Sequence, residues 1–397
     1  MNWQDAQAVD IIRAVMRSFM FSLQPARLHL RSAGFGLVAC GFLSMNVSGK
    51  TFEARGQQFT AFKSFGTFKK SPGKQPGEII LTSREIHSRI AWDELIASWN
   101  VEMPASAYLK IEARAIYPNH TTKWYVFGLW SGDPARHPRE SVRRQKDADG
   151  NVDTDTLILH APTKRFQIRL TLGGAGRERP KLKFLGLSLT DTTATPELLP
   201  ANRAAWGRTL DVPERSQMAY ENGGVLCSPT TVSMMLAHWS RVLKRPSLDH
   251  DVPEIVTGVH DPKWGGTGNW VFNTAYAGAL PGMRAYTARL TDVAELEDWI
   301  ARGIPVGLSL CYNRLRGKGR EPSGHLVVCV GFTATGDVIV NDPGTSKNVR
   351  KVFPRANLVD AWAHSKNAAY FIYPETVRLP TDRFGHWESA KAKPVLK

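Results

Sequence analysis

Residues 216–239 read SQMAYENGGVLCSPTTVSMMLAHW, and this stretch decides the fold of the second half of the chain. A polar loop with two adjacent glycines leads to Cys227, and Ser228-Pro229 follows directly. Proline fits the first turn of a helix, where its missing N–H removes no hydrogen bond. The apolar residues that come next have the spacing of one buried helix face: Val232, Met235, Leu236, Trp239 and Val242. The pattern predicts a helix that begins at or beside Cys227.

A cysteine at the start of a helix is in a position that favours a catalytic nucleophile. The partial positive charge of the helix N-terminus stabilises a thiolate, and the thiolate is the attacking form of the residue. The alternative is a small buried residue that closes the helix against a sheet. The residues downstream decide between these interpretations.

A β-meander is predicted downstream, with strands over residues 304–312, 325–332 and 338–341. His325 opens the second of these strands, and Asp342 follows the third. A turn centred near residues 335–336 would place residue 346 opposite His325, four residues beyond Asp342 and on the same face. Asp342 therefore reaches His325 only if the turn at Pro343-Gly344 curls toward it.

These residue types in this order favour nucleophilic catalysis. His325 would take the thiol proton of Cys227, and Asp342 would orient the imidazole. Gln217, ten residues before Cys227, would stabilise an oxyanion together with the Cys227 N–H. Each residue has a structural alternative: a strand-end histidine, an Asp-Pro-Gly turn and a surface glutamine. The order of all four residues along the chain, together with their places at the ends of helices and strands, favours the catalytic interpretation.

The second half of the chain resembles the C39-like cysteine peptidases, which have a papain-like fold, over roughly residues 205–375. The motifs that carry the resemblance are Ser216-Gln217, Cys227-Ser228-Pro229-Thr230, Gly324-His325-Leu326-Val327-Val328 and Asn341-Asp342-Pro343. The resemblance implies Cys227 as nucleophile, His325 as general base, Asp342 as its orienter and Gln217 in the oxyanion hole. The family usually has glycine and alanine where this chain has Ser228 and Thr230.

Residues 50–200 predict an all-β domain, a jelly-roll-like sandwich of the kind that accompanies secreted bacterial relatives. We expect Trp92, Trp99, Trp124 and Trp130 to be core residues rather than a carbohydrate-binding face. The expected strands cover residues 77–82, 107–117, 123–130, 154–160, 165–172 and 181–189. The expected organisation is a signal-like segment over 1–49, the β-sandwich over 50–200, an α+β papain-like peptidase domain over 201–380 and a tail over 381–397.

The N-terminal segment predicts export. Arg27 and Arg31 precede a short apolar, small-residue run over 32–49 that resembles a secretory signal. The run is too short to span a bilayer. Leu37 to Gly41 also resembles a lipobox, in which Cys40 would carry a lipid. We therefore expect a secreted, periplasmic or cell-surface protein.

Two further stretches are weaker site candidates. Asp147, Asp149, Asn151 and Asp153 alternate as calcium ligands do, but the glycine is misplaced for an EF-hand, and we favour a polar hairpin turn. In the glycine-rich loop before residue 270, Asn269 and Trp270 either face a substrate or cap a helix. No cofactor is expected.

Composition and charge limit the classes of partner that we expect. The net charge of +15 is spread over both halves of the chain and suits an anionic partner. We find no basic helix, zinc-finger spacing or RNP-like motif, so nucleic acid is not expected. Cys311 and Cys329 either pair as a disulfide or stay buried thiols, and we favour thiols.

The sequence thus predicts an exported, monomeric cysteine peptidase that hydrolyses a peptide or protein substrate at the cell envelope through a thioester. The alternatives are acyl transfer to an amine and a binding protein without activity.

Overall fold

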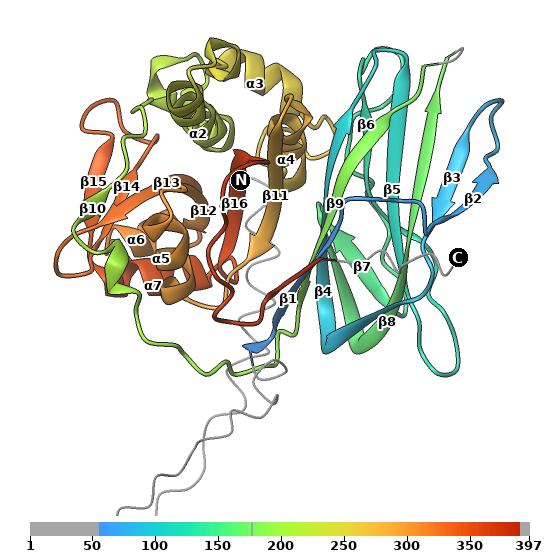
Figure 1. Cartoon of the computed structure of the whole chain (residues 1–397), viewed down its shortest axis with the longest axis horizontal. Helices are drawn as coiled ribbons and strands as arrows, with labels where there is room; N and C mark the ends of the chain where they lie inside the picture. Colours follow the sequence, from blue (N-terminus) through green and yellow to red (C-terminus); the bar gives the residue numbers. More distant parts are fainter. Residues whose placement is uncertain (1–54, 176–177, 390–397) are drawn as a thin grey trace, which may run out of the picture. The chain divides into compact units, whose positions relative to one another are not determined.

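Helix α2 (Cys227–Leu243) is the element around which the second half of the chain is built (Figure 1). The computed structural model describes residues 55–175 and 178–389, and it begins α2 at Cys227 as predicted. Side chains from Ser228 to Ser240 are all buried, so the helix is covered on every side rather than on one face. The predicted burial of Val242 is wrong: it is 57% exposed, because the last turn of the helix emerges from the core.

Helix α2 packs on a seven-stranded sheet in which every neighbouring pair is antiparallel. The three predicted strands of the meander are confirmed as β12, β13 and β14. The strands, in their order across the sheet, are β11 (Met283–Arg289), β16 (Ala368–Pro374), β12 (Val306–Cys311), β13 (Gly324–Phe332), β14 (Val338–Asn341) and β15 (Arg350–Phe353), with β10 (Arg208–Thr209) paired to β13.

Helices cover both faces of this sheet. Tyr370 of β16 faces α2, since its hydroxyl lies 2.8 Å from the Ser228 hydroxyl. The next residue, Phe371, faces the other way and packs against Trp299, with ring centroids 4.4 Å apart. The remaining helices are α3 (Val252–Val259), α4 (Trp270–Ala279), α5 (Val293–Ala301), α6 (Tyr312–Leu315) and α7 (Arg355–Ala363).

The first half of the described chain is β-rich, as predicted. Its strands join one continuous sheet that bends at bulges in two long strands, β4 and β8. The jelly-roll-like pair of sheets stays a prediction. The strands are β1 (Gln57–Phe62), β2 (Lys69–Pro72), β3 (Ile79–Thr82), β4 (Ile86–Glu102), β5 (Ala107–Ala115), β6 (Tyr125–Ser131), β7 (Gly150–Asp153), β8 (Thr156–Gly174) and β9 (Lys181–Thr190).

Three of the four tryptophans singled out in this region are core residues, as predicted. Trp92, Trp99 and Trp130 are buried. Trp124 is half-buried instead, and the guanidinium groups of Arg114 and Arg169 lie 4.6 and 4.4 Å from its ring centroid. Trp124 therefore belongs to the polar face of the sheet rather than to its core.

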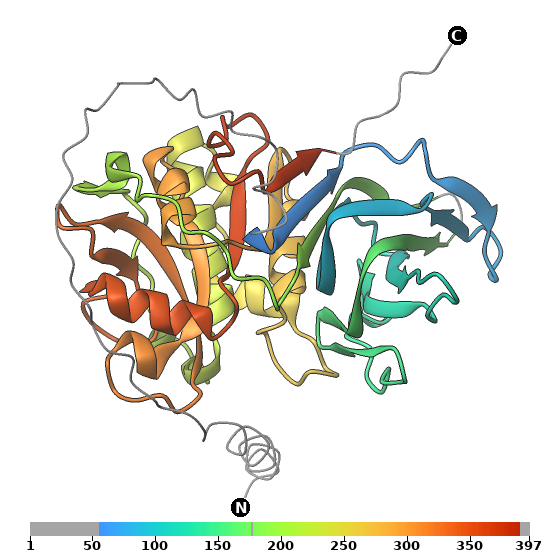
Figure 2. The same cartoon turned by 90° about the horizontal axis from the view of Figure 1, so that it is seen from below.

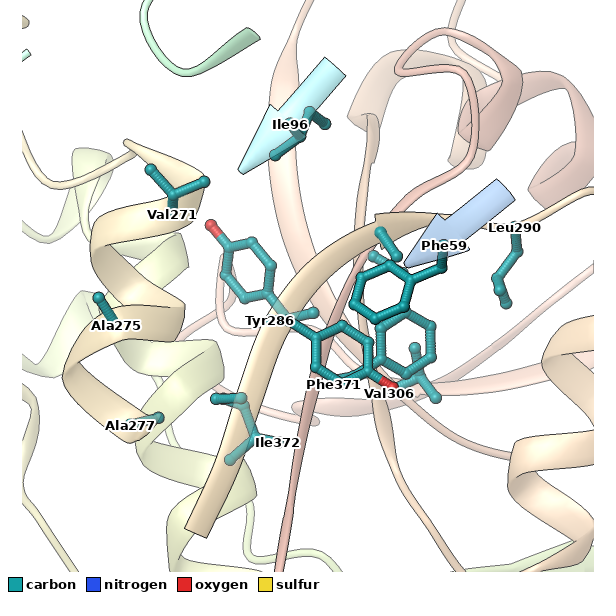
Figure 3. Packing of buried hydrophobic residues seen from close by; sticks show 14 of the residues in the cluster. Phe59, Ile96, Val271, Ala275, Ala277, Tyr286, Leu290, Val306, Phe371 and Ile372 are labelled. Carbon is teal, nitrogen blue, oxygen red and sulfur yellow. The ribbon is translucent and has the colours of Figure 1, made fainter. Parts of the chain in front are cut away.

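The β-rich region and the α2 region share one hydrophobic core. Phe59 of β1 packs on Tyr286 of β11, with ring centroids 4.5 Å apart, and Tyr286 stacks on Phe371 at 5.2 Å (Figure 3). The buried amide of Asn100 in β4 bonds both backbone groups of Ala285, at 2.6 and 3.2 Å. These contacts fix β4 against β11.

The C-terminal segment is more than a peripheral tail. Strand β17 (Trp387–Ser389) pairs in parallel with β1, and Figure 2 shows the two strands side by side. His386 is buried and its Nδ1 lies 2.7 Å from Glu295. Residues 382–389 therefore tie the α2 region to the β-rich sheet.

The signal-like segment over 1–49, including Cys40, lies outside the described residues, so export stays a prediction. Among the helices that the structure does describe, none has the length and apolar character needed to cross a membrane.

We expect Asn100→Ala to lower the free energy of unfolding by about 2–4 kcal/mol, because it leaves a buried N–H and a buried C=O of β11 without partners. Chemical denaturation followed by circular dichroism measures this change. Asn151→Ala, at a half-buried position in β7, is the control and should change stability by less than about 0.5 kcal/mol. Equal effects of the two substitutions would show that the Asn100 bridge does not hold the regions together.

Candidate active site

Cys227 is the first residue of α2 and is partly exposed, whereas the thirteen residues after it are buried. The 3-10 helix η4 (Gly223–Val225) ends two residues before Cys227, and no side chain caps the start of α2. The N–H groups of the first helical turn therefore have no side-chain cap beside the thiol, and their partial positive charge favours an anion there.

His325 and Asp342 meet directly. Nε2 of His325 lies 2.8 Å from Oδ1 of Asp342, and both side chains are buried. Cys227 lies beside the same ring, since its side chain is one of the hydrogen-bond partners that raise the pKa of His325. The structure thus brings the predicted Cys227, His325 and Asp342 together in one chain of contacts.

The hairpin reaches this geometry by a register that the sequence did not predict. Near the turn Phe332 pairs with Val338, one residue off the predicted register, and a bulge between Cys329 and Gly331 shifts the pairing by one more, so that Val328 lies opposite Asn341. Continuing the pairing by three residues puts residue 344 opposite His325, instead of residue 346. Asp342 is then two residues short of His325 rather than four, and the turn at Pro343-Gly344 closes the remaining gap.

Gly344 is the residue that lets this turn close. A β-carbon there would lie 3.0 Å from Cε1 of His325 and 3.2 Å from Oδ1 of Asp342. Its backbone N–H donates to the same Oδ1 at 2.9 Å. A side chain at this position would press on the ion pair, so glycine suits the close approach of the backbone.

Asp342 is fully buried and accepts hydrogen bonds on both oxygens. Oδ1 takes the bonds from His325 and Gly344, while Oδ2 accepts from the Tyr312 hydroxyl at 2.6 Å and from Lys351 Nζ at 3.2 Å. Tyr312 also packs its ring on His325, with centroids 4.2 Å apart. Sequence reasoning missed Tyr312 and Lys351. A signal was present only for Tyr312, which ends the predicted strand over 304–312 and in the structure directly follows β12.

The electrostatics of the pair keep both partners charged. Burial lowers the pKa of His325, but the hydrogen bonds to Asp342 and Cys227 outweigh it and raise the pKa to about 9. Burial raises the pKa of Asp342, but the bonds from His325 and Tyr312 outweigh it and hold the pKa well below its usual range. His325 is therefore an imidazolium at neutral pH.

Gln217 lies at the same site. Its backbone N–H donates to the Pro343 carbonyl at 3.0 Å, which ties it to the Asp342 turn. Its side chain is buried, and Nε2 donates one hydrogen to the Gly223 carbonyl at 2.6 Å. A second Nε2 hydrogen remains for another acceptor.

Comparison with known proteins finds a matching family model in each half of the chain. Residues 79–189 match the family model of the peptidase C39 N-terminal domain, and residues 209–370 match that of the C39-like peptidase family. Residues 209–370 therefore belong to the C39-like peptidase family. A search of curated proteins gave no match. A Bacillus anthracis crystal structure, provisionally described as a C39-like peptidase, is similar at 16% identity and a TM-score of 0.33, over 42% of this chain and 96% of that one.

Two positions at which this chain departs from the usual pattern of the C39-like family have local partners. Ser228 pairs with Tyr370, as described above. The Thr230 hydroxyl donates to the Leu226 carbonyl at 2.7 Å. Both groups are buried and satisfied, so neither departure disturbs the start of α2.

Asn269 is the N-cap of α4 and is only 1% exposed, so of the two expected roles the structure shows the capping one. Its Oδ1 accepts from the Phe272 N–H and its Nδ2 donates to Asp261. Trp270 lines a cavity whose lining does not include Cys227.

The side chains of the candidate calcium loop do not form a metal-binding cluster. Residues 150–153 form β7, which turns into β8 as a hairpin, the form we favoured. Asp147 accepts from Tyr125 and pairs with Lys123 at 3.0 Å, while Asp149 pairs with His120 at 2.8 Å. Over residues 55–175 and 178–389, no cluster of three His, Cys, Asp or Glu side chains could hold a metal.

Cys311 and Cys329 are buried thiols and do not pair, as we favoured. Burial raises the pKa of Cys329 to about 12. Both provide internal controls for the reactivity of Cys227.

We expect iodoacetamide to alkylate Cys227 readily at neutral pH, because the imidazolium of His325 stabilises its thiolate. His325→Gln should slow this reaction about tenfold or more. The two rates should converge as the pH rises through about 9, where His325 loses its proton. Mass spectrometry of each cysteine peptide over a pH series gives the rates. Wild-type and His325→Gln proteins that react alike at neutral pH would rule out the ion pair.

We expect Tyr312→Phe to lower the free energy of unfolding by about 1.5–3 kcal/mol, because a buried carboxylate loses a donor. Tyr117→Phe is a matched control, since its hydroxyl donates to the Ala161 carbonyl at 2.6 Å in an exposed setting. That control should cost about 1 kcal/mol or less. Urea denaturation compares the two, and equal losses would show that Asp342 does not depend on Tyr312.

Proposed function

We propose that this chain is a cysteine peptidase with a papain-like catalytic domain, in which Cys227 attacks a peptide carbonyl. One observation carries the proposal. His325 bonds the buried Asp342 through Nε2 and has Cys227, at a helix start, as a further hydrogen-bond partner. Membership of the C39-like family supports the same chemistry.

The residues have distinct roles in the acylation step. The Cys227 thiolate forms a bond to the carbonyl carbon, and the carbonyl π electrons move to the oxygen. The Cys227 N–H and the second Nε2 hydrogen of Gln217 donate to this oxyanion. His325 gives its proton to the leaving amine as the C–N bond breaks, which leaves a thioester on Cys227.

Deacylation reverses the role of His325. The neutral imidazole, oriented by Asp342, takes a proton from water, and the resulting hydroxide attacks the thioester carbonyl. The C–S bond then breaks, releasing a carboxylic acid and restoring the thiolate–imidazolium pair. If an amine replaces the water, the same thioester yields a new amide, which is the acyl-transfer alternative.

Incubation of the full chain with a mixed peptide library, followed by mass spectrometry, tests the proposal. We expect cleavage products with wild type, and at least a thousandfold loss, to order of magnitude, with Cys227→Ala. Cys311→Ala is the control, because it removes a buried thiol that the mechanism does not use.

Two other outcomes would contradict the proposal. Amide products that appear only when glycine amide is added would identify an acyltransferase. Peptide retention without cleavage, unchanged in Cys227→Ser, would identify a binding protein.

A further inference from the structure

The segment between Tyr312 and His325 carries a cation at every second position over residues 314–320, which we call the basic loop. The cations of the basic loop are Arg314, Arg316, Lys318 and Arg320. Both flanking residues belong to the site, because Tyr312 donates to Asp342 at 2.6 Å and His325 lies 2.8 Å from the same carboxylate. The site therefore holds both ends of the segment that contains the basic loop.

Arg316 connects the basic loop to the imidazole through one aromatic ring. Its guanidinium carbon lies 3.8 Å from the centroid of the Tyr312 ring, and that centroid lies 4.2 Å from the centroid of the His325 ring. The guanidinium is therefore within about 8 Å of the imidazole, which is about two residues of extended peptide. The Arg316 side chain is only partly buried, so a bound chain at the site can contact it.

Arg316 and Lys318 have no carboxylate of the protein as a partner. Nη2 of Arg316 donates to the side-chain oxygen of Asn313 at 2.9 Å, and this acceptor is neutral. Within residues 55–175 and 178–389, no carboxylate oxygen lies within 4.0 Å of either cation. Lys318 is exposed. Both charges are therefore available to an anion from outside the protein.

The carboxylates around the basic loop do not cancel its charge. Asp360, on the helix α7 that packs against α6, lies 3.3 Å from Arg314 and 3.8 Å from Arg320. Glu321 directly follows the loop and is exposed. Four cations thus face two carboxylates, and the excess of two positive charges attracts a carboxylate of a substrate.

The charged groups of the site do not offset this excess. His325 and Lys351 are cations, and they balance Asp342 and the Cys227 thiolate. Lys347, in the loop after Asp342, is exposed and adds a further cation. The surroundings of His325 are therefore positive in sum.

The chemistry brings the leaving group next to this charge. His325 donates its proton to the leaving amine, so the first residue after the scissile bond lies beside the imidazole. Tyr312 packs on that imidazole, and Arg316 lies over the ring of Tyr312. The C-terminal side of the scissile bond is thus the side that Arg316 can contact.

We propose that the basic loop selects peptide substrates that have an acidic side chain within about three residues after the scissile bond. Arg316 and Lys318 bind the Asp or Glu carboxylate, and the ring of Tyr312 holds Arg316 beside the imidazole. The inference rests on the proposed peptidase function and names the substrate class of that site.

Retention of peptides on the full-length Cys227→Ala protein tests the proposal without cleavage. The probes are two libraries of acetylated, amidated hexapeptides, identical except that Asp and Glu in one are Asn and Gln in the other. We expect the acidic library to be retained several-fold more than the neutral one. This preference should shrink as the salt concentration rises from about 50 to 500 mM, because salt screens exposed charges.

Variants in the same background assign the preference to the basic loop. Arg316→Gln with Lys318→Gln should reduce it about three- to tenfold, because the two unpaired cations are lost. Arg316→Lys with Lys318→Arg keeps both charges and should keep most of the preference. The matched control is Lys69→Gln with Lys70→Gln, which removes the same net charge from two exposed positions in β2. The control should leave the preference unchanged.

Three outcomes would overturn the inference. The first is equal retention of the two libraries. The second is a preference that Arg316→Gln with Lys318→Gln leaves intact. The third is an equal reduction in the Lys69→Gln, Lys70→Gln control, since the net charge of the whole molecule would then be responsible.

Wild-type cleavage of the acidic library tests the position of the carboxylate. Asp and Glu should be enriched after the cut, and enrichment only before the cut would contradict the proposal. Failure of the peptidase function gives a different result. In that case the retention preference and its loss in Arg316→Gln with Lys318→Gln persist, while wild type cleaves neither library.

Discussion

The burial of one carboxylate, Asp342, is the constraint on which the site depends. A buried ionised carboxylate costs several kcal/mol unless its oxygens are bonded and its charge is paired. Here the donors come from four places: His325 opens β13, Tyr312 follows β12, Lys351 lies in β15 and Gly344 belongs to the turn after β14. Satisfying Asp342 therefore requires four segments to meet at one edge of the sheet, and that meeting fixes the imidazole against Cys227.

Two helices, α2 and α4, begin near this edge, and they differ in how their first turns are capped. The start of α2 has no side-chain cap, which leaves its partial charge to the Cys227 thiol. The start of α4 is capped by Asn269 and also donates the Trp270 N–H to Asp155 from the β-rich region. Burial raises the pKa of Asp155 to about 6, despite the bonds it accepts. One helix start is thus free for chemistry, and the other helps to join the two regions.

The β-rich region is consequently a structural part of the molecule around the site. It shares a core with the α2 region through Phe59 and Tyr286, and Asn100 binds the backbone of β11. A substitution at Phe59 or Asn100 can therefore disturb the strands around the site without touching the residues that perform the chemistry.

The sequence by itself determined the local elements and the order of the site residues. Pro229 and a period of 3.6 predicted the helix at Cys227, and apolar runs predicted the strands that carry His325 and Asp342. These signals are short-range, so they can be read from neighbouring residues. Only the tertiary structure decided the turn position and the bulge, which together shift the residue opposite His325 from 346 to 344, and the donors Tyr312 and Lys351. It also decided the capping role of Asn269 and the 17-residue strand β4, which no local pattern singled out. Those features follow from contacts between segments far apart in the chain, and the local period of a sequence does not encode such contacts.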